Sequence, residues 1–133
     1  MDEVWGVGID LVQIKRIRRI CRRRRKKFLH RVFTEEERSR LFCRDGDPHP
    51  RIAARFAAKE AVLKALGCGI GPARLQEVEI ISDGKRPPRV KLHGQALRIA
   101  RRAGVDRVLI SLSHEKTMAC AQALAVGKSI KLY

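Results

Sequence analysis

The segment Arg-Phe-Ala-Ala-Lys-Glu-Ala-Val-Leu-Lys-Ala-Leu-Gly, residues 55–67, predicts a long helix at the centre of the fold. Alanine, leucine, lysine, glutamate and arginine dominate it, and all of them favour helix. Gly67 stands where a helix commonly ends, so we expect the helix to cover about residues 51–66. At about 3.6 residues per turn, one face of this helix carries both apolar groups and the pair Glu60 and Lys64.

Glu60 and Lys64 allow two interpretations. A carboxylate and an ammonium four residues apart commonly form a surface ion pair worth about 0.2–0.5 kcal/mol. The same two groups on a partly apolar face are also typical of a functional site. The helix alone leaves this choice open, and the rest of the chain has to decide it.

Upstream of this helix, residues 4–9 read as a short apolar strand whose glycines let another element pack closely. Asp10 follows at the expected strand-to-helix junction, where a carboxylate serves either as a helix cap or as a site residue. A helical pattern begins at Leu11, with Ile14 and Ile17 also facing inward. The basic run 22–27 interrupts this pattern, which resumes at residues 28–33. The run therefore belongs to a folded helix.

The remaining segments predict an α+β fold in a single domain, residues 1–133. Thr34 to Glu37 match a capping box that starts a short helix, and a loop at 43–50 precedes the central helix. Beyond the glycine-rich turn 67–72 we expect strands at 77–82 and 89–92, a helix at 94–102, a buried strand at 108–113 and a last strand at 118–126.

Composition narrows the possible partners. The 133 residues hold 30 Lys and Arg against 14 Asp and Glu, a formal net charge of +16, which attracts anionic molecules. The four cysteines are widely spaced, so we expect neither a zinc site nor disulfides, but reduced thiols in a cytoplasm. No signal peptide and no apolar run of about 20 residues is present, so we expect no membrane partner.

Three segments together resemble the holo-[acyl-carrier-protein] synthases, the small bacterial 4′-phosphopantetheinyl transferases. They are residues 7–10 (Val-Gly-Ile-Asp), residues 55–67 and residues 110–114 (Ile-Ser-Leu-Ser-His). The resemblance implies the fold of that family, a small antiparallel sheet with a long central helix, assembled as a homotrimer with active sites between subunits. It also implies Mg²⁺-dependent transfer of phosphopantetheine from coenzyme A to a serine of apo-acyl carrier protein, in fatty acid biosynthesis.

The resemblance also implies roles for individual residues. Asp10 and Glu60 would bind Mg²⁺, a hard cation suited to carboxylates and phosphates, and Lys64 would place its charge on the phosphates. The catalytic set is then Asp10, Glu60 and Lys64, with either Glu60 or a water on the metal as general base. The coenzyme A site would be lined by Arg55, Phe56, Lys59, Lys64, Gly67, Gly69, Pro87 and His114. For His114, a purely structural role is equally compatible with the sequence.

The basic helix acquires a partner from the same resemblance. Acyl carrier proteins are small and acidic, so exposed cations on this helix would attract one electrostatically. The residues in question are Arg16, Arg23, Arg24, Lys27 and Arg31.

Two other functions compete with this one. A nucleic-acid-binding module would explain the high net charge, but aromatic residues are only 5% and no nucleic-acid motif is present. It would also leave Asp10 and Glu60 unexplained, as would a basic assembly protein without catalytic activity. We therefore expect coenzyme A and an acyl carrier protein as partners, rather than nucleic acid.

Overall fold

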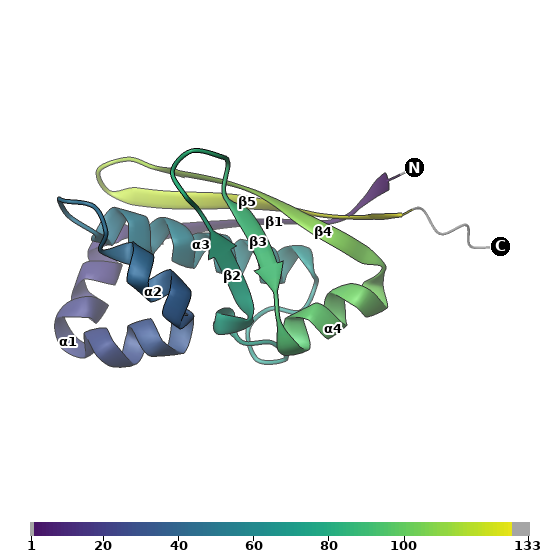
Figure 1. Cartoon of the computed structure of the whole chain (residues 1–133), viewed down its shortest axis with the longest axis horizontal. Helices are drawn as coiled ribbons and strands as arrows, with labels where there is room; N and C mark the ends of the chain where they lie inside the picture. The colour runs from purple at the N-terminus through teal and green to yellow at the C-terminus, as the bar shows by residue number, and fades with distance from the viewer. Residues whose placement is uncertain (1, 129–133) are drawn as a thin grey trace.

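The computed structural model describes residues 2–128, and their mixture of helices and antiparallel strands confirms the α+β class (Figure 1). In chain order the elements are β1 (Asp2–Gln13), α1 (Ile14–Val32), α2 (Glu35–Leu41), α3 (His49–Ala65), the 3₁₀ turn η1 (Leu75–Glu77), β2 (Val78–Ile81), β3 (Arg89–Leu92), α4 (Gly94–Ala103), β4 (Val105–His114) and β5 (Met118–Lys128). None of the helices in this range has the length and apolarity needed to cross a bilayer.

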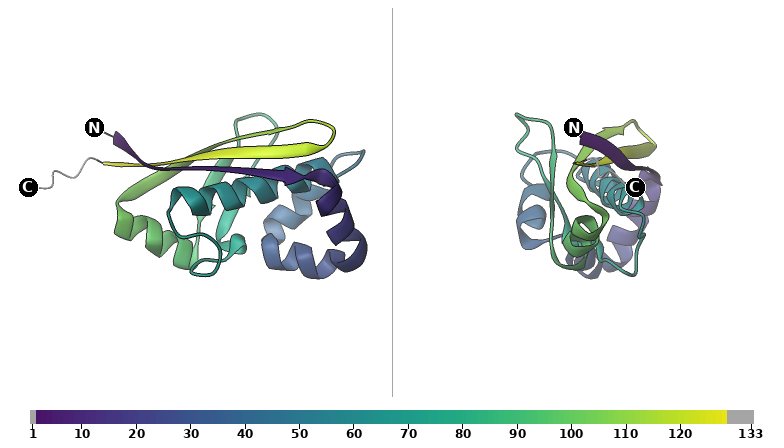
Figure 2. Two further views of the ribbon diagram at one scale, coloured as in Figure 1. Left: turned by 180° about the vertical axis from the view of Figure 1, so that it is seen from behind. Right: turned by 90° about the vertical axis from the view of Figure 1, so that its right-hand side faces the viewer.

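Helix α3 lies along one face of a three-stranded sheet with the order β1-β5-β4 (Figures 1 and 2). Helices α1 and α2 pack near one end of α3, α4 lies near the other, and β2 and β3 form a separate hairpin beside it. Most of α3 is buried, including a series of alanines whose small side chains allow close packing.

Two glycines on β1 allow the sheet to approach α3. A Cβ atom at Gly6 would lie 1.9 Å from the carbonyl oxygen of Ala65, and one at Gly8 would lie 1.8 Å from that of Ala61. Any side chain at these positions would push the strand away from the helix. Because side chains alternate along a strand, Asp10 is the next residue to face α3.

The start of the chain corrects two expectations. Strand β1 continues to Gln13, paired with Met118 of β5, and α1 begins only at Ile14. Asp10 therefore lies within a strand and is not at a strand-to-helix junction. Leu11, expected in the core, is 64% exposed because it points to the sheet face opposite α3.

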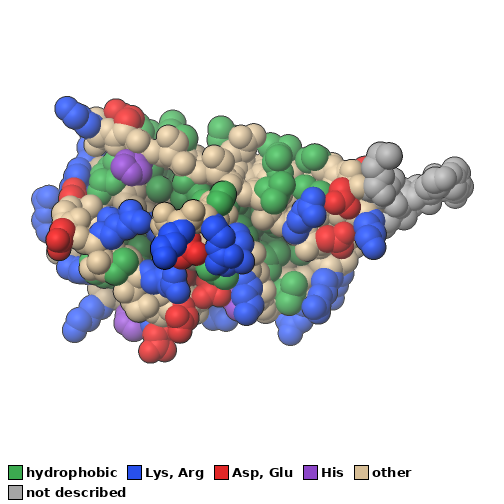
Figure 3. Space-filling model, turned by 45° about the horizontal axis from the view of Figure 1, so that its top comes forward, with side chains coloured by type: hydrophobic (Ala, Val, Ile, Leu, Met, Phe, Trp, Pro, Cys, Tyr) green, Lys and Arg blue, Asp and Glu red, His purple; other side chains and the backbone are tan. Residues whose placement is uncertain are grey.

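The opposite face of the sheet is also more apolar and more open than expected. Strand β4 was expected to be buried, yet it is an edge strand and its Leu109 is 50% exposed. Val7, Leu124 and Leu109 form one row across the three strands. No described element covers this face, on which apolar side chains gather (Figure 3).

The helix ends and turns agree with the sequence in most places. Thr34 and Glu37 form the expected capping box, and Gly104 ends α4 in the left-handed conformation. Helix α1 spans the basic run, but its backbone is kinked at Arg24 (φ −143°, ψ 47°). Glu77, expected to begin a strand, lies in η1 because its carboxylate accepts hydrogen bonds from nearby backbone N–H groups.

Candidate active site

Two carboxylates meet between β1 and α3. Asp10 faces α3 from the sheet, and Lys64 donates hydrogen bonds to its Oδ1 (3.2 Å) and to the carbonyl of Ile9 (2.9 Å). Burial and then the nearby Asp10 carboxylate raise the pKa of Glu60, while Arg16 and Lys64 act in the opposite direction. Asp10, Glu60 and Lys64, predicted as catalytic from distant parts of the sequence, therefore share one electrostatic cluster.

This donor set suits a hard divalent cation. Mg²⁺ binds one or two carboxylates and completes its shell with water and substrate phosphates. Two carboxylates close enough to raise a pKa repel each other, and a cation between them would relieve that repulsion. Within residues 2–128 no group of three or more His, Cys, Asp or Glu side chains is arranged to hold a metal ion.

A second site, which we call the arginine cavity, lies on another side of α3. It has a volume of about 360 Å³ and opens between α2, α3, the β2–β3 turn and the end of β4. Four guanidinium groups line it, together with a histidine and an aspartate; these residues are Arg40, Arg44, Arg51, Arg55, His114 and Asp83. Guanidinium groups are well suited to bind phosphates in bidentate geometry.

The pKa of Arg55 reflects the concentration of positive charge in the arginine cavity. Burial lowers the pKa of its guanidinium, Arg51 lowers it further, and the Glu37 carboxylate opposes both. The sequence identified Arg55 and His114 but missed Arg40, Arg44 and Arg51. The spacing of Arg51 and Arg55, one helical turn apart, was the available signal. In the turn between β2 and β3, Pro88 lines the cavity. Pro87, which was predicted to contact coenzyme A, does not line it.

The two sites lie on different flanks of α3. A helix turns by about 100° per residue, so the five residues from Arg55 to Glu60 correspond to a rotation of about 140°. The charges that shift the two pKa values agree with this separation. The pKa of Arg55 is shifted by Arg51 and Glu37, whereas the pKa of Glu60 is shifted by Asp10 and Arg16.

Four other residues predicted to bind coenzyme A use their side chains or backbone N–H groups for contacts within the protein. Phe56 is 6% exposed and packs against Phe28, with ring centroids 5.8 Å apart. Lys59 is fully buried and paired with Glu37. The N–H groups of Gly67 and Gly69 donate to carbonyl oxygens of α3, at 2.9 and 3.4 Å. For Phe56 and Lys59 this geometry favours a structural role, and coenzyme A contact stays a prediction without support from the structure.

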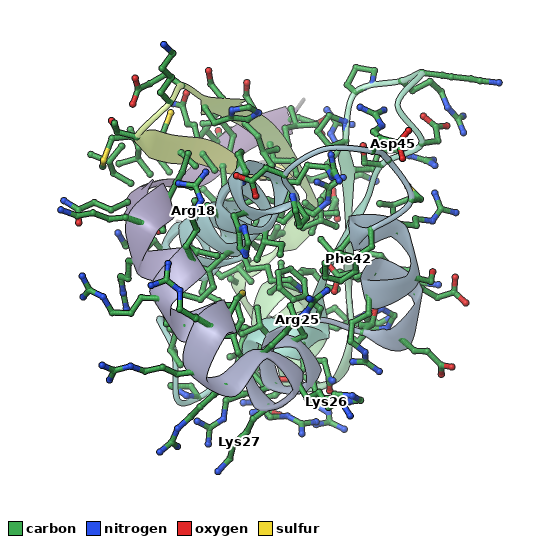
Figure 4. The ribbon with its side chains drawn as sticks, turned by 90° about the vertical axis from the view of Figure 1, so that its left-hand side faces the viewer. Arg18, Arg25, Lys26, Lys27, Phe42 and Asp45 are labelled. Atoms are coloured by element: carbon green, nitrogen blue, oxygen red, sulfur yellow. The ribbon has the colours of Figure 1, made fainter. Side chains whose placement is uncertain are left out.

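Helix α1 carries its cations in two settings. Arg18 forms an ion pair with Asp47, and the Arg25 guanidinium lies 4.4 Å from the ring centroid of Phe42, so both fasten α1 to the segment that follows α2. Figure 4 shows Arg25 turned toward Phe42, whereas Lys27 points outward. The five cations predicted to bind the carrier protein are all exposed: Arg16, Arg23, Arg24, Lys27 and Arg31.

Comparison with known proteins gives a consistent result. A holo-[acyl-carrier-protein] synthase of Desulforudis audaxviator is 46% identical over 126 residues, 95% of each chain. An acyl carrier protein synthase of Plasmodium yoelii, solved with ADP bound, superposes with a TM-score of 0.87 at 29% identity, covering 97% of this chain and 99% of that one. The Helicobacter pylori synthase in complex with coenzyme A gives 0.76 at 31% identity, covering 90% and 98%. A family model also matches residues 6–122, and the chain therefore belongs to the 4′-phosphopantetheinyl transferase superfamily.

Proposed function

We propose that this chain is a holo-[acyl-carrier-protein] synthase, which transfers 4′-phosphopantetheine from coenzyme A to a serine of apo-acyl carrier protein. The observation that carries the proposal is the convergence of Asp10, Glu60 and Lys64 between β1 and α3, in a chain of this superfamily. The rival function of nucleic-acid binding explains the positive charge but gives these carboxylates no role. Fatty acid biosynthesis and a cytoplasmic location belong to the same proposal.

In the proposed reaction, the serine hydroxyl oxygen attacks the phosphorus that carries the pantetheine arm. A new P–O bond forms to serine, the pyrophosphate P–O bond breaks, and its electron pair leaves with 3′,5′-ADP. The serine proton must pass to a base. Glu60 is one candidate, because its carboxylate lies in the same electrostatic cluster as Asp10 and Lys64, and a water molecule is the other.

Asp10 and Glu60 would hold Mg²⁺, which when bound would offset the negative charge of the pyrophosphate and of the leaving phosphate. Lys64 adds a positive charge beside Asp10 without closing the site, since its side chain is 51% exposed. A compact ammonium at this place would hold the phosphates of the substrate by charge-assisted hydrogen bonds.

The arginine cavity would bind the nucleotide end of coenzyme A. Its guanidinium groups would neutralise the 3′-phosphate, and His114 at the end of β4 would contact the same region. Arg40, Arg44 and Arg51 are thereby added to the predicted coenzyme A residues. The remaining anionic segment, the pyrophosphate, would have to reach the carboxylates on the other flank of α3.

The apolar sheet face supplies a reason for trimer formation. Val7, Ile9, Leu11 and Leu109 are 50–66% exposed although all four are large aliphatic residues. An apolar patch of this kind marks an interaction surface in a water-soluble fold. We propose that these faces pack together in a homotrimer, so that the arginine cavity of one subunit lies beside the carboxylates of the next. This arrangement would unite the two halves of the site that α3 separates.

The transfer reaction is tested by incubating the protein with apo-acyl carrier protein, coenzyme A and Mg²⁺, and recording the mass of the carrier. We expect the mass to increase by one phosphopantetheine group, and no increase when Mg²⁺ is chelated. An unchanged carrier in the complete mixture, together with salt-sensitive and metal-independent binding of duplex DNA, would favour the nucleic-acid rival.

A further inference from the structure

The ammonium group of Lys59 has no hydrogen-bond donor left for a ligand. Its side chain is fully buried, and Nζ donates to Glu37 Oε1 (2.7 Å), to the carbonyl of Leu75 (3.1 Å) and to the carbonyl of Val78 (2.6 Å). A lysine ammonium has three N–H donors, and all three are used here. Burial lowers the pKa of Lys59, and the paired Glu37 carboxylate favours its charged form.

Glu37 is equally committed to the fold. Besides the bond from Lys59, its Oε1 accepts the backbone N–H of Thr34 (2.9 Å) and its Oε2 accepts that of Ile80 (3.0 Å). The pair therefore joins the start of α2, the middle of α3, the 3₁₀ turn η1 and strand β2. Such a fully satisfied buried polar network holds its elements in one relative position.

Three of the elements joined by this pair, α2, α3 and β2, are also walls of the arginine cavity. Arg40 follows Glu37 by three residues on α2, and Arg55 precedes Lys59 by one turn on α3. Ile80, whose N–H is held by Glu37, lines the cavity directly. The next wall residue, Ser82, accepts a hydrogen bond from Arg40 through its carbonyl (3.1 Å).

The cavity needs such a support because its arginines repel one another. Arg51 and Arg44 each lower the pKa of Arg55, and the Glu37 carboxylate is the larger of the two influences that raise it. Arg51 and Arg55 share α3, but Arg40 on α2 and Arg44 in the loop after α2 lie on other segments, and like charges on separate segments tend to move apart unless those segments are fixed. A displacement of about 1 Å in binding groups is enough to cost as much as a hundredfold in turnover.

We propose that Glu37 and Lys59 are positioning residues for coenzyme A binding, which set the spacing of the arginine cavity and do not touch the coenzyme. This inference rests on the proposed role of the cavity as the nucleotide site. It assigns to Lys59 a function different from the direct contact implied by its place in the sequence motif.

The test compares Glu37→Gln and Lys59→Met with a matched control, Glu77→Gln. Glu77 is also a buried carboxylate that accepts two backbone N–H groups, those of Arg74 (2.8 Å) and Gln95 (2.7 Å), but none of these residues lines the arginine cavity. Its replacement therefore disturbs a buried carboxylate without changing a residue that lines the cavity, and the melting temperature of each variant measures the loss of stability. All variants are assayed well below the lowest melting temperature of the set.

We expect the KM for coenzyme A to rise about tenfold or more in both Glu37→Gln and Lys59→Met, a change equivalent to about 1.4 kcal/mol of binding. The KM for apo-acyl carrier protein should stay near the wild-type value, and Glu77→Gln should leave both constants unchanged. Equal rises in the KM for coenzyme A in Glu77→Gln and the two variants would overturn the proposal, because general destabilisation would then be the cause.

The double variant Glu37→Gln/Lys59→Met separates positioning from direct contact. Lys59→Met alone leaves a buried carboxylate without its cation, whereas the double variant buries no unpaired charge. Recovery of coenzyme A affinity in the double variant, relative to Lys59→Met, supports positioning. No recovery, with a much smaller effect of Glu37→Gln, would assign Lys59 to direct contact and overturn the proposal. Absence of transfer by the wild-type protein would instead refute the proposed function itself.

Discussion

The two flanks of α3 carry clusters of opposite charge. On one flank, four arginines from α2, the loop after it and α3 line a cavity, and the buried Glu37–Lys59 pair joins α2 to α3. On the other, two carboxylates face each other with Lys64 beside them. The first arrangement suits binding of a large anion, and the second suits a cation and a reacting phosphate. The comparison indicates that one helix separates binding from chemistry, and the following predictions test that separation.

The largest effect is expected from removing a carboxylate. Asp10→Ala and Glu60→Ala should each lower kcat by about a hundredfold or more, because charge stabilisation in the transition state is lost. Binding of coenzyme A, measured by calorimetry, should weaken by less than about tenfold, since the arginine cavity is intact. Arg55→Ala should show the reverse pattern, with weaker binding and a smaller loss in kcat. A similar loss of binding in all three variants would contradict the separation.

Mixing two defective variants should restore activity if neighbouring subunits share each site. Glu60→Ala retains an intact arginine cavity, and Arg55→Ala retains intact carboxylates. In randomly mixed trimers, about one quarter of the sites would combine the two intact halves, because each half is present with a chance of about one in two. The measurement is the rate at low coenzyme A concentration after co-expression. A rate equal to the mean of the two separate variants would mean that each subunit uses its own two flanks.

The sequence predicted the carboxylate flank better than the arginine flank. Asp10, Glu60 and Lys64 lie in compact motifs with a specific spacing, and the fold brings them together. The arginine cavity draws its residues from α2, the following loop, α3 and β4, and in a chain with 30 Lys and Arg no pattern distinguishes these arginines from the others. Only the packing of separate elements selects them.

Lys59 and Leu11 show why local patterns mislead. Lys59 lies in the motif beside Glu60, but the difference of one position turns it toward Glu37 and into the core, where its side chain is fully buried. Leu11 fits the helical period of the residues that follow it, yet it pairs with Cys120 of β5 and the strand continues to Gln13. In both cases tertiary contacts decide what a short segment does, as is common for residues of ambiguous pattern.

A medium effect is expected from the exposed cations of α1. Arg23→Glu/Arg24→Glu should raise the KM for apo-acyl carrier protein by about tenfold and leave the KM for coenzyme A nearly unchanged, because exposed charges mainly govern encounter with an acidic partner. The wild-type rate at low carrier concentration should fall with added salt, which screens charges beyond about 10 Å at 0.1 M. Lys91→Glu, an exposed change on β3 that lines no described cavity, is the matched control. An equal rise in both constants would place α1 in support of the fold or of the coenzyme site.

The smallest expected effect concerns the stability of the carboxylate flank itself. Burial and the Asp10 carboxylate raise the pKa of Glu60 above its ordinary value of 4.5, so the folded chain holds this proton more tightly than the unfolded chain does. Above the folded-state pKa, the ionised carboxylate therefore lowers the free energy of unfolding. As the pH falls below 4.5, Glu60 becomes protonated in both the folded and the unfolded chain, and this reduction in the free energy of unfolding disappears.

Glu60→Gln removes that charge at every pH. Without Mg²⁺ at pH 7, the variant should melt higher than the wild type by on the order of one or two degrees, and the difference should vanish near pH 4. With Mg²⁺ the order should reverse, because only the wild type gains stability from binding the cation. Thermal melts at both pH values, with and without Mg²⁺, measure all of these differences. A variant less stable than the wild type at pH 7 without Mg²⁺ would show that Arg16 and Lys64 outweigh burial and Asp10, and that the carboxylate flank is not under electrostatic strain.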